Sequence, residues 1–162
     1  MSSSNSASPP ANAAVPENGT ESVVSCDDRD WQVPTFTITE LAPKQHDYCV
    51  VIPVINEGER IGRLLQKMKV LNISSIADII IVDGGSKDGS LAQEKLTATS
   101  VRTLLIKTGP GKLSAQLRCA YAYSLRQGYT GIVTIDGNDK DDPDAIGGII
   151  GELRKGADFV QG

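Results

Sequence analysis

The stretch that decides the fold is CVVIPVINEGERIGRLLQKMKVL, from Cys49 to Leu71. Its first seven residues are apolar and rich in β-branched side chains, which is typical of a strand buried on both faces. The following residues predict an amphipathic helix, with Asn56 as its N-cap. Its apolar positions have helical spacing and are Ile61, Leu64, Leu65 and Met68. A buried strand followed at once by a helix is the first half of a βαβ unit.

Three further predicted strands follow, each with a helix after it. The strands are DIIIVD (78–83), VRTLLIK (101–107) and GIVTID (131–136), and the helices are 90–96, 112–127 and 142–155. Gly128 and Gly156 end the last two helices, and Asp142 and Pro143 open the final one as N-cap and first residue. Alternating strands and helices build parallel sheets through right-handed crossovers. The sequence therefore predicts an α/β fold with three αβα layers and a mostly parallel sheet.

The flanking segments divide the chain into three parts. Residues 1–30 are rich in Ser, Pro and Ala without apolar periodicity, and are predicted to be disordered. Residues 31–46 form a lead-in segment, in which TFTITEL (35–41) alternates weakly and predicts a short edge strand. Residues 47–162 form the predicted domain, with ADFVQG (157–162) beginning a fifth strand.

Charge and cysteine content argue against several classes of protein. Sixteen basic and twenty acidic residues give a net charge of -4, which argues against a nucleic-acid-binding face. The three cysteines are far apart and His46 is the only histidine, so no zinc site is expected, and Cys49 and Cys119 are expected in the core. No apolar run approaches the roughly 20 residues that cross a bilayer, and the N-terminus lacks the features of a secretory signal. We therefore expect a cytoplasmic protein.

Polar residues collect where each of the first four strands of the predicted domain ends. They are Pro53 and Glu57 around the end of the first strand, Asp83 at the end of the second, Lys107 and Lys112 at and after the end of the third, and Asp136 at the end of the fourth. Because the carboxyl ends of parallel strands meet at one edge of a sheet, we expect these residues to face one crevice. Carboxylates can accept hydrogen bonds from a base or ribose, lysines can meet a diphosphate, and acids can hold a divalent cation against phosphates. The sequence therefore predicts a nucleotide site.

Other nucleotide and cation motifs do not match. GPGK is not a P-loop, because Ile106 and Leu113 stand where glycine and Ser or Thr are required. No GxGxxG opens the helix after the first strand, and DGNDKD fails as an EF-hand loop because Asp141 replaces the required glycine. Asp141, Asp142 and Asp144 are explained by helix capping and the helix dipole.

Several motifs together resemble a known family. VVIPVINEGERI, IIIVDGGSKDGS and GPGKLSAQLRCAYAYSLRQGYTGIVTIDGNDKDDPDAI are similar, in order and spacing, to the nucleotide-binding half of family-2 inverting glycosyltransferases. The resemblance covers residues 48–162 and is strongest to the dolichyl-phosphate mannose synthases and other polyprenyl-phosphate sugar transferases. It implies the GT-A fold. Members of that family continue beyond the position of Gly162, so the resemblance implies the donor-binding part of a longer protein.

The resemblance also assigns roles to the matching residues. Pro53, Ile55 and Glu57 match a loop that lines the base and ribose of the nucleotide sugar. Asp83, with Ile81 beside it, matches an acid that contacts the base.

The remaining matches concern the diphosphate. Lys112 matches the lysine of a glycine-rich loop, and Asp136, Gly137 and Asn138 match the DxD motif. In that motif the first residue meets the ribose and the metal, and the last holds the metal against the diphosphate. The implied cofactor is Mg²⁺ or Mn²⁺, and Asp136 is the implied catalytic residue.

Two positions depart from the family pattern. Ile55 stands where a tyrosine is usual, which removes a stacking partner for the base. Asn138 stands where the second aspartate of DxD is usual, so one negative charge is missing and weaker metal binding is expected. Asp139, which has no assigned role, or an acid outside this chain would have to compensate.

The implied reaction transfers a hexose-type sugar from a nucleoside diphosphate sugar, with inversion, to an acceptor such as a polyprenyl phosphate. That acceptor is already ionised near neutral pH, so no general base is needed, and it implies a protein peripheral to the cytoplasmic face of a membrane. Two other classes remain open. One is a non-catalytic nucleotide-sugar-binding or interaction module. The other is a sugar-nucleotide pyrophosphorylase, which would want a glycine- and arginine-rich loop where this chain has PVINEGER.

Overall fold

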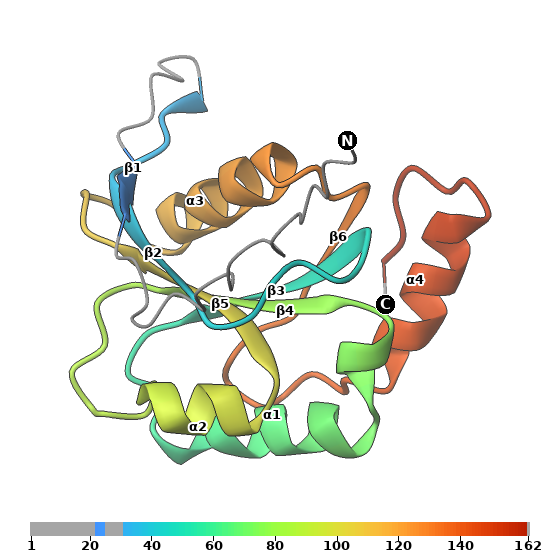
Figure 1. Cartoon of the computed structure of the whole chain (residues 1–162), viewed down its shortest axis with the longest axis horizontal. Coiled ribbons are helices and arrows are strands. Elements are labelled where there is room, and N and C mark those ends of the chain that lie inside the picture. The colour runs from blue at the N-terminus through green and yellow to red at the C-terminus, as the bar shows by residue number, and fades with distance from the viewer. Residues whose placement is uncertain (1–21, 25–30, 162) are drawn as a thin grey trace, which may run out of the picture.

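The structure, a computed structural model, describes residues 31–161 and the backbone of residues 22–24 (Figure 1). The tail predicted to be disordered, residues 1–30, and Cys26 within it lie outside the described residues except for β1 (Ser22–Val24), which is a short strand. Within the described part, no helix is long and apolar enough to cross a membrane.

The described residues form a six-stranded sheet in the order β1-β2-β5-β4-β3-β6. The bounds are β2 Phe36–Glu40, β3 Tyr48–Val54, β4 Asp78–Asp83, β5 Val101–Lys107 and β6 Gly131–Thr134. The four strands β5, β4, β3 and β6 are parallel, whereas β1 and β2 pair antiparallel with their neighbours. The predicted mostly parallel sheet is therefore confirmed. The order in which strands are added to the sheet reverses between β3 and β6, since β4 and β5 extend the sheet on one side of β3 and β6 lies on the other.

Helices cover both faces of this sheet (Figure 1). They are α1 Glu59–Val70, α2 Gln93–Ala98, α3 Leu113–Arg126 and α4 Ala145–Arg154, with a short 3-10 helix, η2, at Ile73–Ser75. Buried side chains of α1, α2 and α4 share one core cluster with the sheet, and those of α3 share another. One core lies on each face of the sheet, so the sheet is the middle one of three layers. This confirms the predicted αβα architecture.

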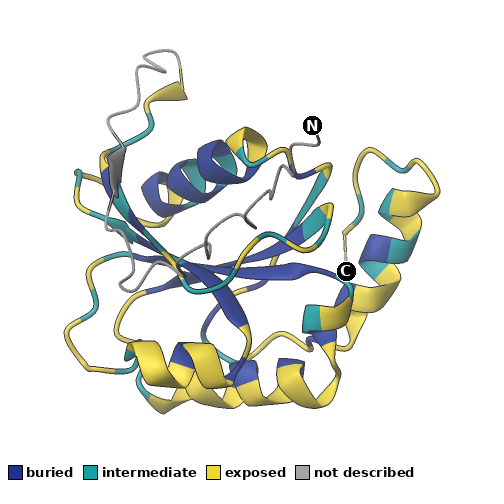
Figure 2. Cartoon of the chain, viewed as in Figure 1, coloured by how far each residue is buried: buried dark blue, intermediate teal, exposed yellow. Residues whose placement is uncertain are grey.

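The central strands are buried on both sides, as the dark ribbons in Figure 2 show. In β3, Val50 and Ile52 face the cluster that contains α1, whereas Cys49 and Val51 face the cluster that contains α3. This alternation explains why the stretch is apolar at every position rather than at every second one. The four apolar residues predicted on α1 are all buried, and so are Cys49 and Cys119.

The prediction that Asn56 caps α1 is wrong, because α1 begins at Glu59. Asn56 has a left-handed backbone, with φ of 50°. Its side-chain Oδ1 accepts a hydrogen bond of 2.8 Å from the backbone N–H of Lys87. Asn56 thus holds the loop after β4, thirty-one residues away in sequence.

Two other predicted helices begin later than expected, α2 at Gln93 and α4 at Ala145. In front of α4, Oδ1 of Asp142 accepts a hydrogen bond of 3.1 Å from the backbone N–H of Asp144. Asp142 therefore caps a turn that leads into the helix, and Asp144 becomes the residue before its first turn. Gly156 follows the end of α4 with φ of 98°, as predicted for a helix stop.

Two predictions about strands also need correction. TFTITEL forms β2 with its predicted alternation, but β1 pairs on its outer side, so β2 is not at the edge. The predicted fifth strand of the domain does not form, since residues 157–161 are irregular. An extended segment needs a neighbouring strand for its backbone hydrogen bonds. Phe159 remains 80% exposed.

Candidate functional site

A cleft of about 420 Å³ opens at the carboxyl ends of the parallel strands. It lies where the strand order reverses, between β3 and β6, which is where open α/β sheets bind their ligands. Five of the nine residues predicted for the site line it, namely Pro53, Ile55, Glu57, Lys112 and Asp136. These residues come from the end of β3 and from the segments that follow β3, β5 and β6. Gly84 adds the segment after β4, so the structure brings all four predicted strand ends together.

A larger groove of about 1070 Å³ runs along the outer side of α1 towards α2 and the segment before α4. It contains none of the predicted site residues. The smaller cleft is the better candidate, because it combines convergent polar groups with the sheet edge where parallel sheets bind ligands.

Glu57 lines the cleft, and its carboxylate pairs with Arg60. Its Oε2 lies 2.9 Å from Nη2 of Arg60, and the side chain is 15% exposed. The pair is an ion pair without the alignment of a hydrogen bond, and Oε2 accepts no hydrogen bond within the described chain. Glu57 thus places a carboxylate in the lining of the cleft, with one oxygen paired to Arg60.

The loop that carries Glu57 is tied to the loop after β4. The backbone N–H of Asn56 donates to Oγ of Ser86 at 2.9 Å, and that of Gly58 donates to Oδ2 of Asp88 at 2.8 Å. Hydrogen bonds from Ser90 and from the Gly58 backbone hold the pKa of Asp88 below its usual range. Asp88 is thus ionised at neutral pH and fixes the wall of the cleft.

The structure places Asp83 and Ile81 away from the lining of the cleft. Asp83 is 5% exposed, and its carboxylate accepts hydrogen bonds from the backbone N–H groups of Gly85 and Ser86 and from Oγ of Ser86 at 2.6 Å. It therefore closes its own loop. Ile81 is fully buried in the core on the α1 side of the sheet. Among the residues after β4, Gly84 reaches the cleft instead.

Gln116 is a lining residue that the sequence analysis missed. It lies on α3, is 3% exposed, and its Nε2 donates to the carbonyl oxygens of Val54 at 2.9 Å and Val82 at 3.0 Å. One side chain thus joins the ends of β3 and β4 beneath the cleft. The available signal was a lone amide on the apolar face of a predicted helix, where a polar group needs buried partners.

The segment at and after the end of β5 supplies two lysines, of which one is already hydrogen-bonded and the other is not. Nζ of Lys107 donates to the carbonyl oxygen of Gly109 at 2.8 Å, so it is already engaged. Lys112 directly precedes α3, and its ammonium makes no hydrogen bond or ion pair within residues 31–161. An unengaged ammonium beside the positive end of a 14-residue helix makes this side of the cleft suited to an anion.

The segment after β6 surrounds Asp136. Nδ2 of Asn138 donates to Oδ2 of Asp136 at 2.8 Å, and Oδ1 of Asn138 accepts from the backbone N–H of Lys140 at 3.0 Å. The backbone N–H of Asp136 donates to Oδ2 of Asp141 at 3.1 Å, which gives Asp141 a role in the loop. Gly137 is buried against β3.

This arrangement does not fit a divalent cation as it stands. A cation bridging Asp136 and Asn138 would need an oxygen from each, but the amide of Asn138 presents its nitrogen to the carboxylate. Asp139 turns away from the cleft and bonds to α1. In the described residues, no three His, Cys, Asp or Glu side chains are grouped to hold a metal.

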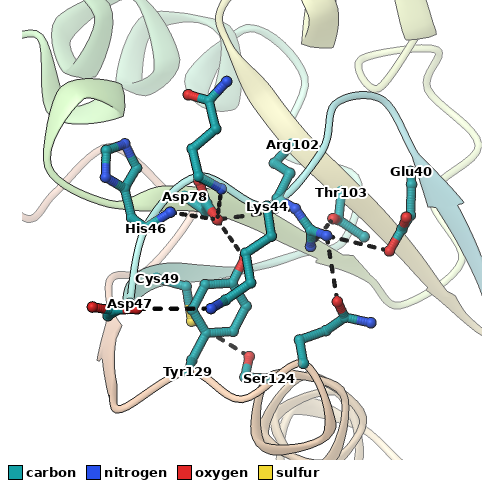
Figure 3. Close-up of polar contacts among 12 residues, drawn as sticks. Glu40, Lys44, His46, Asp47, Cys49, Asp78, Arg102, Thr103, Ser124 and Tyr129 are labelled. Carbon is teal, nitrogen blue, oxygen red and sulfur yellow. Dashed lines mark hydrogen bonds and ion pairs between the residues drawn. The ribbon is translucent and has the colours of Figure 1, made fainter.

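A second polar cluster lies at the opposite end of the sheet, around Asp78 and Arg102 (Figure 3). Both side chains are 5% exposed, and Nε of Arg102 lies 3.9 Å from Oδ2 of Asp78. Asp78 accepts a hydrogen bond of 2.7 Å from the hydroxyl of Tyr129. Arg102 donates to the hydroxyl of Tyr123 at 2.7 Å and reaches Glu40 at 3.4 Å. This cluster joins β2, β4, β5 and α3 and serves the fold rather than the cleft.

Alkaline pH is expected to destabilise the fold through groups in and beside this cluster. Burial raises the pKa of the Cys49 thiol from 9.0 to about 12, and burial raises that of Tyr123 from 10.0 to about 12. The folded state therefore binds these protons more tightly than the unfolded state. Stability is complete below pH 9 and is lost as the pH rises from 9 towards 12.

The measurement is the urea midpoint of unfolding at pH 7, 9 and 10. Cys49→Ala should reduce the decrease between pH 9 and 10, since Cys49 begins to titrate there in the unfolded state before Tyr123 does. Equal decreases in the wild type and the variant would contradict the assignment to Cys49.

Large parts of this chain are similar to known proteins. The sequence profile of the family described as "Glycosyl transferase family 2" matches residues 49–162. Polyprenol monophosphomannose synthase of Mycolicibacterium smegmatis is 28% identical over 116 residues, which are 70% of this chain and 43% of that protein. Glucosyl-3-phosphoglycerate synthase of the same organism is 32% identical over 63 residues, which are 38% of this chain and 21% of that protein.

A solved structure is also similar, that of glucosyl-3-phosphoglycerate synthase from Mycobacterium tuberculosis in complex with Mn²⁺, uridine diphosphate and glucosyl-3-phosphoglycerate. The TM-score is 0.46 at 23% identity, over 65% of this chain and 39% of that one. The present chain thus spans less than half the length of each of these relatives.

Proposed function

Because the chain belongs to glycosyl transferase family 2, we propose that its cleft binds a nucleoside diphosphate sugar and that the protein transfers the sugar from it to an acceptor with inversion. The observation that supports this most is the convergence of Glu57, Lys112 and Asp136 on one cleft from the ends of three different strands. Each has the chemistry that one part of such a donor needs. The proposed donor-binding domain is residues 47–162.

The nucleoside is proposed to lie against the loop after β3. The Glu57 carboxylate, which is paired with Arg60, is proposed to accept a hydrogen bond there from a ribose hydroxyl or a base N–H. Ile55 is 52% exposed and offers the base an apolar contact in place of aromatic stacking. Pro53 lines the same wall, and Asp83 supports it from behind by fixing its own loop.

The diphosphate is proposed to lie between Lys112 and Asp136. Negative charge grows on the diphosphate as the sugar departs, and an ammonium already in place stabilises that charge without reorganisation. The start of α3 adds a further positive potential. Asp136, the proposed catalytic residue, is held by the Asn138 amide at the sugar end of the cleft.

The proposed acceptor is a polyprenyl phosphate, in line with the name of the relative that aligns with 70% of this chain. A phosphate oxygen is already ionised near neutral pH, so the attack needs no general base from the protein. A lipid acceptor would bring the protein to a membrane surface. The alternative is a binding module without turnover, which would bind the donor but transfer nothing to a polyprenyl phosphate.

Calorimetric titration of the protein with GDP-mannose, UDP-glucose and UDP-N-acetylglucosamine tests this proposal. We expect one donor to bind, and Lys112→Met to weaken its binding about tenfold, or about 1.4 kcal/mol. Lys155→Met is the matched control, because Lys155 pairs with Glu152 on the exposed surface of α4 and should leave donor binding unchanged. If a folded protein binds none of the donors, the proposal fails.

The same titration with and without Mn²⁺ tests the cation. Mg²⁺ or Mn²⁺ can join Asp136 to the diphosphate only if the Asn138 amide turns its oxygen towards the ligand. We therefore expect Mn²⁺ to change the donor affinity of the wild type less than about threefold, and that of Asn138→Asp at least about tenfold. An equally strong Mn²⁺ effect in the two proteins would mean that Asn138 is already a cation ligand.

A further inference from the structure

Asp139 joins the loop around Asp136 to helix α1. Its Oδ1 lies 2.8 Å from Nζ of Lys67, and its Oδ2 lies 3.1 Å from Nε of Arg63. Both contacts are hydrogen bonds between charged groups, and they connect residues more than 70 positions apart in the sequence. Each oxygen of the carboxylate therefore has its own cationic donor on the same helix.

The exposure of the three side chains shows which charge depends on the others. The Asp139 side chain is 9% exposed, whereas those of Arg63 and Lys67 are 56% and 52% exposed. A carboxylate withdrawn from water needs partners, while a half-exposed lysine or arginine is still hydrated. The hydrogen bonds from Lys67 and Arg63 also hold the pKa of Asp139 below its usual range. The arrangement is therefore a fixed attachment of the loop.

The backbone supports the same interpretation. Asp139 has φ of 61°, in the left-handed region that side chains rarely adopt except in Asn and Asp. The Asn138 side chain bonds on either side of this turn, to Asp136 and to the backbone of Lys140. The turn therefore directs Asp139 to α1 while it directs the Asn138 amide to Asp136.

The attachment joins two segments that carry residues of the cleft. Helix α1 begins two residues after Glu57, so the helix that holds Asp139 is continuous with the loop proposed to bind the nucleoside. Asp136, three residues before Asp139, lines the same cleft as Glu57. The ion pairs therefore fix the loop that carries Asp136 to the helix that continues the Glu57 loop.

We propose that Asp139, through Arg63 and Lys67, is a positioning residue that holds Asp136 and Asn138 in place for the diphosphate sugar. The identity of the ligand in this inference rests on the proposed function. The attachment of Asp139 to α1 does not depend on that function. Asp139 does not line the cleft, and its effect is on the loop that carries Asp136, which does.

Asp139→Asn is the variant of choice, because asparagine also adopts a left-handed backbone and only the charge is removed. We expect its affinity for the nucleoside diphosphate sugar that the wild type binds to fall at least tenfold, while its affinity for the free nucleoside changes less than twofold. Arg63→Met combined with Lys67→Met should give the same pattern. Adding Asp139→Asn to that double variant should cause no further loss.

The matched control is Glu59→Gln. Glu59 is the other acid near Arg63, at 3.9 Å, and is almost fully exposed, so its loss should leave both affinities unchanged. Equal losses of nucleoside and donor affinity in Asp139→Asn would overturn the inference, because they would indicate a general structural defect. Unchanged donor affinity would also overturn it.

A measurement without any ligand keeps the inference separate from the proposed function. In the wild type, the backbone N–H groups of Asp136 and Lys140 are hydrogen-bonded within the loop. Asp139→Asn should speed their hydrogen exchange at least tenfold and leave that of β4 unchanged. If the wild type binds no donor, the proposed function fails, and this exchange result alone decides whether Asp139 holds the loop. Unchanged exchange would overturn the inference in either case.

Discussion

Replacing Arg102 with methionine is expected to lower the free energy of unfolding by about 3–5 kcal/mol, the cost typical of removing one partner from a buried charge pair. The side chains of Arg102 and Asp78 are both 5% exposed, so the carboxylate would be left in the interior without its cation. The hydroxyl of Tyr123 and the carboxylate of Glu40 would lose a hydrogen-bond donor at the same time. The measurement is equilibrium unfolding in urea at pH 7.

Lys155→Met provides the comparison for this prediction. Lys155 forms an ion pair of 2.8 Å with Glu152, but both side chains are more than half exposed, and such pairs contribute about 0–1 kcal/mol. The difference between the two variants therefore measures the effect of burying an ion pair, rather than the effect of ion pairing itself. A loss below about 1 kcal/mol in Arg102→Met would show that the cluster rearranges around the missing charge.

Replacing Gly137 with alanine is expected to weaken donor binding by at least about tenfold and to lower the free energy of unfolding by about 1–3 kcal/mol. A Cβ atom at position 137 would lie 2.8 Å from the carbonyl oxygen of Pro53 and 3.0 Å from Cγ2 of Val54. Both belong to β3, which is paired on both edges and cannot move aside. The loop that carries Asp136 and Asn138 must then shift away from the cleft. Calorimetry and urea unfolding measure the two effects.

Gly148→Ala is the matched control for Gly137→Ala. Gly148 is an exposed glycine inside α4, and a Cβ atom there would meet nothing within 4 Å. Alanine is favoured over glycine in helices, so this variant should gain about 0.5–1 kcal/mol of stability with unchanged donor binding. Donor binding that survives in Gly137→Ala would mean that Asp136 does not need its present position.

The elements of the core could be predicted from the sequence because their signals are local. The continuous apolar runs of β3 and β4 and the helical spacing on α1 are each complete within about a dozen residues. Asn56 was wrongly expected to cap α1 because its partner, the backbone of Lys87, lies in another loop. A sequence pattern shows which groups an asparagine can bond, but the tertiary fold decides which of them is near.

The candidate site likewise contains residues whose positions could be predicted from the sequence and residues whose positions could not. Glu57, Lys112 and Asp136 could be predicted to converge because they follow strands whose carboxyl ends must meet at one edge. Asp83 ends such a strand too, yet its carboxylate bonds to Gly85 and Ser86 of its own loop. That outcome was available from DGGS, since aspartates often hydrogen-bond to the backbone two residues later. The contacts of Asp139 with α1 had no local signal, because both partners are more than 70 residues away.

The two polar systems of this protein lie at opposite ends of the same strands. β4 begins at Asp78, in the buried charge cluster, and ends at Asp83, behind the cleft. The five residue steps between them span roughly 17 Å, a distance at which substitutions contribute additively. Natural variation can therefore reshape ligand preference at one end while the other end preserves foldability. In the laboratory, a stabilised version of this scaffold could be selected first and its specificity diversified afterwards, because neither step should undo the other.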